Sequence, residues 1–157
     1  MRKPILFISL IILLVTGACK KDSTSEIDTE YPVINIESAK AFPKQCSTVK
    51  RGETFFFRAE LSDNTALGSV SIDIHHNFDH HTHSTELASC DMEAVKTPVT
   101  PFLLIQSYPI PAGLGSYEVQ QQITVPANVD PGDYHFMIRL TDKEGWQTIK
   151  GLSIKVI

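Results

Sequence analysis

The sequence has no excess of positive charge. It carries 14 lysine and arginine residues against 18 aspartates and glutamates, so the net charge over 157 residues is −4. Binding to nucleic acids depends largely on lysine and arginine side chains that neutralise phosphates. The composition therefore argues against a nucleic-acid-binding protein, and we expect no nucleic acid among its partners.

An apolar run long enough to cross a bilayer is also missing. The most apolar segment extends from Ile5 to Val15, whereas a transmembrane helix needs about 20 apolar residues. Arg2 and Lys3 precede this segment, and the small residues of 16–18 follow it. This order of basic, apolar and small residues predicts a secretory signal peptide over residues 1–18.

Cysteine is scarce, and no two cysteines have the CxxC spacing that is common in zinc sites. Cys19 directly follows the small residues of the signal, in a pattern that resembles a bacterial lipoprotein whose first mature residue carries lipid. Lipid on Cys19 leaves Cys46 and Cys90 as an even pair in an oxidising compartment, which predicts a disulfide between them. A thiolate metal ligand at either position is the alternative.

Motifs of common enzyme classes are absent. HExxH, GxSxG and a phosphate-binding loop do not occur, and these motifs mark many metalloproteases, esterases and nucleotide-dependent enzymes. A metallohydrolase with a three-histidine zinc ion is the enzymatic hypothesis that remains. We favour a protein that is not an enzyme.

Sustained helical periodicity is absent too, and short alternating segments take its place. Residues 19–30 are mostly polar and predict a lipidated, flexible tether. From Tyr31 onward, runs of alternating apolar and polar residues are separated by proline, glycine, asparagine and aspartate. About seven such strands predict an all-β domain over residues 31–157, an immunoglobulin-like β-sandwich.

Two of the expected strands matter most for function. They cover residues 70–77 and 134–141, which are antiparallel neighbours in an immunoglobulin-like sheet. The spacing of Gly132 and Tyr134 at the start of the second strand is typical of the corner tyrosine of such domains. The other expected strands cover residues 31–36, 53–61, 102–108, 117–125 and 146–156, and residues 90–101 predict a loop.

Histidine is locally abundant. Five of the six histidines lie within residues 72–84, namely His75, His76, His80, His81 and His83. Neutral imidazole is the commonest protein metal ligand, and a dense histidine tract indicates metal binding. A solvated loop that chelates metal only incidentally is the alternative.

The sixth histidine, His135, joins this cluster if the strands pair as expected. His75 ends one strand and His135 begins its neighbour, and alternation directs both side chains away from the core. His81 and His83 share one face of an extended segment because they are two residues apart. Asp79 is a further candidate ligand between them and the strand.

The type of ligand narrows the choice of metal. Three or four imidazoles favour zinc or divalent copper over calcium and magnesium, which prefer oxygen. Asp73 lies two residues before His75 on the same face, where its carboxylate would orient the imidazole from an outer position; a solvated strand residue is the alternative. The acidic turns around Asp63 and Asp142 at the other end would suit calcium, although acidic turns commonly bind nothing.

A series of short motifs runs through the middle of the chain: Ser62-Asp63-Asn64, Leu67, Ile72-Asp73-Ile74-His75, Asn77-Phe78-Asp79 and His81-Thr82-His83. In these motifs the chain resembles a family of Bacteroidetes lipoproteins known as domain of unknown function 4625. The resemblance covers most of the chain from about Tyr31 and implies the fold and an exported location, without an established activity.

Residue by residue, the resemblance narrows the histidine set. It implies that His75, Asp79, His81 and His83 occupy positions of the family pattern, and that the remaining histidines of the tract are extras in variable positions. We therefore expect metal ligands at His75, His81, His83 and His135, with Asp79 beside them.

Two functional hypotheses follow. The first is an outer membrane lipoprotein, at the cell surface or on the periplasmic face, that is anchored through Cys19 and captures, buffers or transfers zinc or copper. The second is a non-catalytic adhesion or accessory module of a surface nutrient-uptake assembly, whose partner is another surface or periplasmic protein and whose histidines are incidental.

Overall fold

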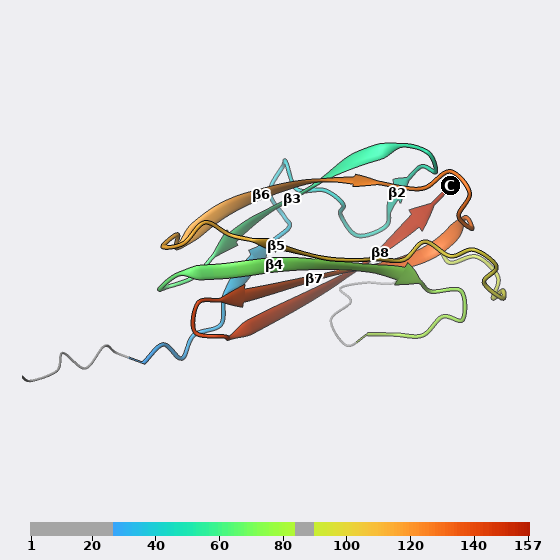
Figure 1. The fold of residues 1–157 in the computed structure, drawn as a ribbon. Coiled ribbons are helices and arrows are strands. Elements are labelled where there is room, and N and C mark those ends of the chain that lie inside the picture. The colour runs from blue at the N-terminus through green and yellow to red at the C-terminus, as the bar shows by residue number, and fades with distance from the viewer. Residues whose placement is uncertain (1–26, 84–89) are drawn as a thin grey trace, which may run out of the picture.

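The computed structural model describes residues 27–83 and 90–157, and these residues form eight strands in two facing sheets (Figure 1). The smaller sheet has the order β1-β3-β6 and the larger sheet the order β2-β8-β7-β4-β5. The strands are β1 (Val33–Asn35), β2 (Ser47–Val49), β3 (Thr54–Ser62), β4 (Leu67–His76), β5 (Leu104–Pro109), β6 (Ser116–Thr124), β7 (Gly132–Asp142) and β8 (Gln147–Val156).

This arrangement confirms the expected all-β sandwich. The order β8-β7-β4 places the last two strands beside the strand that carries the histidine tract, as in the immunoglobulin-like arrangement. No helix in the part of the chain that the structure describes is long and apolar enough to span a membrane.

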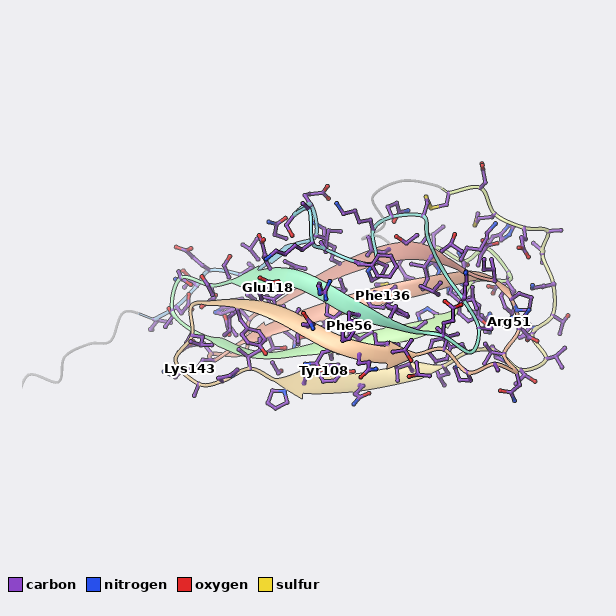
Figure 2. All side chains as sticks on the ribbon, turned by 90° about the horizontal axis from the view of Figure 1, so that it is seen from above. Arg51, Phe56, Tyr108, Glu118, Phe136 and Lys143 are labelled. Atoms are coloured by element: carbon purple, nitrogen blue, oxygen red, sulfur yellow. A yellow bond between two sulfur atoms is a disulfide. The ribbon has the colours of Figure 1, made fainter. Side chains whose placement is uncertain are left out.

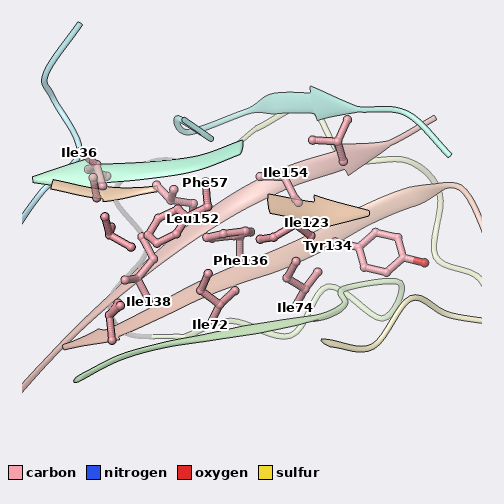
Figure 3. Packing of buried hydrophobic residues seen from close by; sticks show 14 of the residues in the cluster. Ile36, Phe57, Ile72, Ile74, Ile123, Tyr134, Phe136, Ile138, Leu152 and Ile154 are labelled. Carbon is pink, nitrogen blue, oxygen red and sulfur yellow. The ribbon is translucent and has the colours of Figure 1, made fainter. Parts of the chain in front are cut away.

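The core lies between the sheets because alternate residues of each strand point inward. In β4 the buried positions are Leu67, Val70, Ile72 and Ile74, while the residues between them are only half-buried. The largest fully buried side chains include Tyr134, Phe57, Phe136, Leu61, Ile72, Ile74, Ile138, Leu140 and Leu152, several of which are labelled in Figure 3. The strand period of two thus fixes which residues of β4 and β7 face outward.

The structure adds one strand to the seven expected. Strand β2 has only three residues, and it pairs in parallel with the end of β8, with Ser47 opposite Ile154. Such a short segment shows no alternation, and its partner lies more than a hundred residues away in the sequence. The expected strand bounds otherwise differ from the observed ones by a few residues at each end.

The corner tyrosine is present at the start of β7. The hydroxyl of Tyr134 donates a hydrogen bond of 2.7 Å to the carbonyl of Asp130 and accepts one of 3.0 Å from the backbone N–H of Phe102. Burial is the main cause that raises the pKa of this hydroxyl, so it stays protonated. Two loops are thereby attached to the strand that carries His135.

The sandwich has two chemically different ends. We call residues 75–83 together with 132–135 the imidazole end, and residues 27–30, 63–66 and 142–146 the carboxylate end. Figure 2 labels Lys143 at the carboxylate end and Arg51 toward the opposite end. The chain enters at the carboxylate end, beside the turn between β7 and β8 (Figure 1).

Candidate metal site

Two histidines face each other across neighbouring strands at the imidazole end. His75 of β4 is the direct pairing partner of His135 of β7, as the sequence predicted, and their ring centroids lie 5.2 Å apart. Both project from the outer face of the sheet, because Ile74, Tyr134 and Phe136 beside them point into the core. The sheet therefore fixes the backbone positions of half of the histidine cluster.

The loop that follows β4 folds back over these two residues. It begins with a hydrogen bond of 2.8 Å from the backbone N–H of Asn77 to the carbonyl of Asp133, and His80 has a positive φ of 59° that turns the chain. His81 then places its carbonyl oxygen 3.2 Å from Nε2 of His135. This cover explains why His135 is completely buried (0% exposed) although it lies on the outer face.

Four imidazoles converge beneath the loop. They belong to His75, His81, His83 and His135, and one ring nitrogen of each lies within 4.8 Å of those of the others. The closest approach, between Nε2 of His75 and Nε2 of His83, is 3.1 Å. Nitrogens bound to one tetrahedral zinc ion at about 2.0–2.1 Å are about 3.4 Å apart. Small side-chain movements would therefore place all four around one ion.

Three of the four rings have an oxygen atom behind them. Nδ1 of His75 lies 2.8 Å from Oδ1 of Asp73, and Nδ1 of His81 lies 2.6 Å from Oδ1 of Asp79. In His135 the nitrogen that faces an oxygen is Nε2, which lies 3.2 Å from the carbonyl oxygen of His81. Ligand histidines in metal sites usually donate their second N–H to such an oxygen, which fixes the tautomer and orients the ring. For His75 and His81, this arrangement leaves Nε2 directed at the cluster.

The two carboxylates share a local sequence pattern. Asp73 and His75, like Asp79 and His81, are two positions apart with one residue between them, and this spacing puts both members of a pair on one face of an extended segment. The hydrogen bond from His81 is the main cause that lowers the pKa of Asp79. The Asp-x-His spacing, visible in the sequence, was the signal for these outer partners.

The sequence analysis predicts Asp79 as a further ligand beside the four histidines. In the structure its Oδ1 lies 2.6 Å from Nδ1 of His81, and Asp79 is not among the four converging residues. Asp73 lies where the sequence analysis expected it, in an outer position on His75.

The remaining two histidines of the tract lie outside the cluster. Nε2 of His80 is 2.9 Å from the carbonyl of Glu93, and the ring of His76 packs on Phe78 with centroids 5.0 Å apart. Their separation from the four converging rings agrees with their assignment as extras. Both are thus useful as control positions.

A disulfide fixes the chain that follows the loop. Cys46 and Cys90 are joined in the structure, with their Cα atoms 5.6 Å apart. The backbone N–H of Cys46 also donates a hydrogen bond of 2.8 Å to the carbonyl of Ser153 in β8. Cys90 is thus held against the sheet seven residues after His83. Cys19 and residues 1–18 lie outside the described residues.

A shallow hollow of about 270 Å³ opens beside the cluster on the outer face of the larger sheet. His75 and His83 form one side of it, and Ile105 and Met137 form part of the rest. Ile105 lies on the edge strand β5 and is 72% exposed. The imidazoles of His75 and His83 are therefore accessible from solvent along this side.

Comparisons with known proteins place the chain in a family without assigning an activity. The family model described as "Domain of unknown function (DUF4625)" matches residues 17–157. No curated protein matches the chain.

Solved structures with a similar arrangement include the GspB Siglec domain, at 21% identity and a TM-score of 0.42, over 83% of this chain and 59% of that one. Spo0M, a sporulation control protein from Bacillus subtilis, matches at 12% identity and a TM-score of 0.37, over 80% of this chain and 48% of that one. The chain thus spans about half to three fifths of the length of these proteins.

Proposed function

The chain belongs to the DUF4625 family, and we propose that it is an exported lipoprotein whose domain captures, buffers or transfers zinc or divalent copper. The observation that carries the proposal is the convergence of four imidazoles from β4, from β7 and from the loop that follows β4. Three of these rings are backed by oxygen acceptors, which is the arrangement of an oriented metal site.

The four imidazoles favour a transition metal that prefers nitrogen ligands. Four neutral nitrogens suit zinc and divalent copper, and none of them is a hard oxygen of the kind that calcium or magnesium requires. Asp73 and Asp79 add two negative charges directly behind the rings, which balances the charge of a divalent ion. Four protein ligands also fill a tetrahedral shell, and this supports binding in preference to catalysis, which needs an open position.

The burial of His135 argues against an incidental chelating loop. A solvated histidine loop would bind metal through whichever rings meet by chance, without help from the sheet. Here His135 lies 54 residues from His81 in sequence, is completely buried, and contacts the rings of His81 and His83 at centroid distances of 4.7 and 4.6 Å. The sheet therefore supplies part of the site.

Replacement of His135 by alanine tests the metal site directly. The protein is produced without a histidine tag or nickel resin, stripped of metal, and titrated with zinc and with divalent copper by calorimetry. We expect one ion per chain, and His135→Ala should weaken binding by more than about 100-fold, because loss of an outer partner alone costs 10–100-fold. His80→Ala is the matched control, since His80 belongs to the same loop but lies outside the cluster, and it should bind like the parent.

Loss of a buried ring also affects folding, so a second variant is needed. His83→Ala removes a more exposed ligand, and near-ultraviolet circular dichroism reports whether either variant keeps the native packing. Equal affinity of the parent, His135→Ala and His83→Ala would refute the proposed site. A folded His83→Ala variant with weak binding would support it.

Export and anchoring rest on the N-terminal sequence. Residues 1–18 have the pattern of a signal peptide, and Cys19 would carry the lipid that holds the protein in the outer membrane. Cys19→Ser should move the protein from the detergent phase to the aqueous phase in a detergent partition experiment. Unchanged partition of Cys19→Ser would refute lipid anchoring while leaving the metal site untested by that result.

A specific observation favours the alternative of an accessory binding module. The edge strand β5 and the residue before it expose Leu103 and Ile105 to solvent, at 65% and 72%. Apolar side chains on an open sheet edge are suited to pairing with a strand of another protein. Calorimetry that finds no zinc or copper binding to the parent would leave this function as the better one.

A further inference from the structure

We propose a second metal site, for calcium, at the carboxylate end, formed by Asp28, Asp142 and Glu144. One carboxylate oxygen of each lies within 4.8 Å of those of the other two. Calcium binds oxygen ligands at about 2.3–2.6 Å, so ligands on opposite sides of the ion are about 5 Å apart. Three oxygens with the observed separations therefore fit within the shell of one calcium ion.

Two of these carboxylates are buried, and each has one oxygen without a hydrogen-bond partner among residues 27–83 and 90–157. Asp142 is 3% exposed; its Oδ1 accepts hydrogen bonds of 2.6 and 2.8 Å from the N–H groups of Gly145 and Trp146, whereas its Oδ2 has no partner. Asp28 is 8% exposed, and its Oδ2 is likewise without a partner. A buried charged oxygen in this state is costly unless something binds it.

The other oxygen of Asp28 is held in place. Oδ1 accepts hydrogen bonds of 3.0 Å from the N–H of Glu30 and 3.1 Å from the amide of Asn64. The free oxygen is thus the one that the fold leaves for a cation.

Among residues 27–83 and 90–157, no cationic side chain takes the place of a metal at the two buried carboxylates, because none of the ion pairs there involves Asp28 or Asp142. Lys143 lies 3.7 Å from Glu144, and its side chain is 68% exposed. A surface pair of this kind contributes little, and it leaves the two buried carboxylates uncompensated. A divalent cation would satisfy all three groups at once.

The oxygen ligands and their spacing favour calcium over the alternatives. There is no imidazole or thiolate in the group, which disfavours zinc and copper. Magnesium demands near-ideal octahedral geometry at 2.0–2.1 Å and usually keeps several of its waters. Calcium accepts irregular shells of six to eight oxygens, so three carboxylates with water completing the shell suit calcium better.

The proposed ion would join two parts of the chain that are distant in sequence. Asp28 precedes β1, whereas Asp142 and Glu144 belong to the turn between β7 and β8. The indole N–H of Trp146 already donates a hydrogen bond of 2.9 Å to the carbonyl of Asp28. Calcium would add a charged link at this junction, so it would fix the direction in which the chain leaves the domain at residue 27.

Trp146 provides the means to test the site, because it is the single tryptophan of the chain and contacts two of the candidate residues. Terbium takes calcium sites, and its luminescence is excited by a nearby indole. We expect metal-stripped protein carrying Cys19→Ser to sensitise terbium, and calcium to displace it with an affinity on the order of 10⁻⁴ M. Asp142→Asn should weaken binding at least tenfold, and Asp91→Asn, an exposed carboxylate near Cys90, should not.

A second variant and a second measurement keep the outcome clear. Asp28→Asn lies outside the turn between β7 and β8 and should weaken terbium and calcium binding in the same way. Millimolar calcium should raise the midpoint of thermal unfolding of the parent by on the order of 5 °C, and it should not raise that of Asp142→Asn or Asp28→Asn. His83→Ala removes a half-buried ring of the imidazole cluster and should retain calcium binding, which separates this site from the cluster. Equal terbium binding by the parent and both variants, or equal displacement by magnesium, would overturn the proposal.

Discussion

Strand β7 connects two regions that would bind different metal ions through different ligand atoms. His135 lies near its start and Asp142 at its end, about 24 Å apart at the rise of an antiparallel strand. At the imidazole end, nitrogens face the centre of the cluster and carboxylates stand behind them. At the carboxylate end, carboxylate oxygens face the centre and backbone N–H groups stand behind them. Which group faces inward, and which supports it, would therefore set the metal that each end prefers.

The two regions also differ in how they are assembled. The imidazole end takes two of its four imidazoles from paired strands and two from one short loop, so its geometry depends on the sheet register. The carboxylate end takes its three carboxylates from a turn and from the segment that enters the domain. The first should be sensitive to changes within the larger sheet, and the second to changes in the packing of residues 27–30.

Removal of the disulfide should have the largest effect on stability, and it should change metal affinity at the imidazole end but not at the carboxylate end. The loop between Cys46 and Cys90 spans 44 residues, so the chain-entropy model assigns the crosslink about 4 kcal/mol of stability. In the double variant Cys46→Ser and Cys90→Ser, urea denaturation should show this loss. Zinc affinity should fall as well, because Cys90 fixes the chain after His83, while calcium affinity should not. Equal losses at both ends would contradict this distinction.

Loss of the corner hydroxyl should come next. Tyr134→Phe leaves the carbonyl of Asp130 and the N–H of Phe102 without their buried partner, which should cost about 2 kcal/mol in the free energy of unfolding. The ring stays in the core, so His135 should keep its position and zinc affinity should be nearly unchanged. A large loss of zinc affinity would mean that the cluster depends on the overall rigidity of the domain and not on its oriented rings.

A smaller effect is expected when the carboxylate behind His75 is neutralised. Asp73→Asn removes the charged acceptor that lies 2.8 Å from Nδ1 and should weaken zinc binding about tenfold, at the lower end of the range for outer partners. Competition with a chromophoric chelator measures the change, and Asp91→Asn again serves as the control. Parental affinity in Asp73→Asn would show that this carboxylate does not orient the ring.

The smallest effect on stability is expected at Asp130. Backbone N–H groups donate hydrogen bonds to its carboxylate, whereas Oδ2 of Asp142 has no hydrogen-bond partner among the described residues. Hydrogen bonds from Val99 and then Thr100 lower its pKa in the folded state, and Lys96 adds to the shift. A lowered folded pKa stabilises the protein fully above the unfolded value, and that stability is lost as the pH falls through the folded pKa.

The parent should therefore be more stable than Asp130→Asn at pH 7, and the difference should shrink as the pH falls below about 4. Urea denaturation at a series of pH values provides the measurement. A stability difference between the parent and Asp130→Asn that is independent of pH would show that the charge of Asp130 contributes nothing. Added calcium should not alter this difference.

The sequence predicted the position of His75 and His135 at the imidazole end because these two residues obey strand rules. Alternation placed His75 and His135 on the outer face, and the expected order of strands made them neighbours. These inferences need only a period of two and a common topology. The two-residue step from Asp79 to His81 places the carboxylate of Asp79 at Nδ1 of that ring.

The carboxylate end was less accessible to sequence reasoning. Asp28 lies in a polar stretch that predicts a tether, and its burial depends on Trp146 and Asn64, which are distant in the sequence. Strand β2 escaped detection for a related reason, since three residues carry no period and the partner strand β8 is remote. Contacts that join distant segments through a few residues leave no local pattern.

The crosslink at Cys46 also has a mechanical consequence. A pull on the chain before residue 27 would first load the contacts of residues 28–32, such as the hydrogen bond from Trp146 to Asp28, and then the three residue pairs of β1 with β3. Once these contacts open, the segment 27–45 has a contour length of roughly 65 Å. The pull then reaches Cys46 and passes through the disulfide to Cys90. Strands β2, β3 and β4 lie between the two cysteines in the sequence and are thus shielded from tension along the chain.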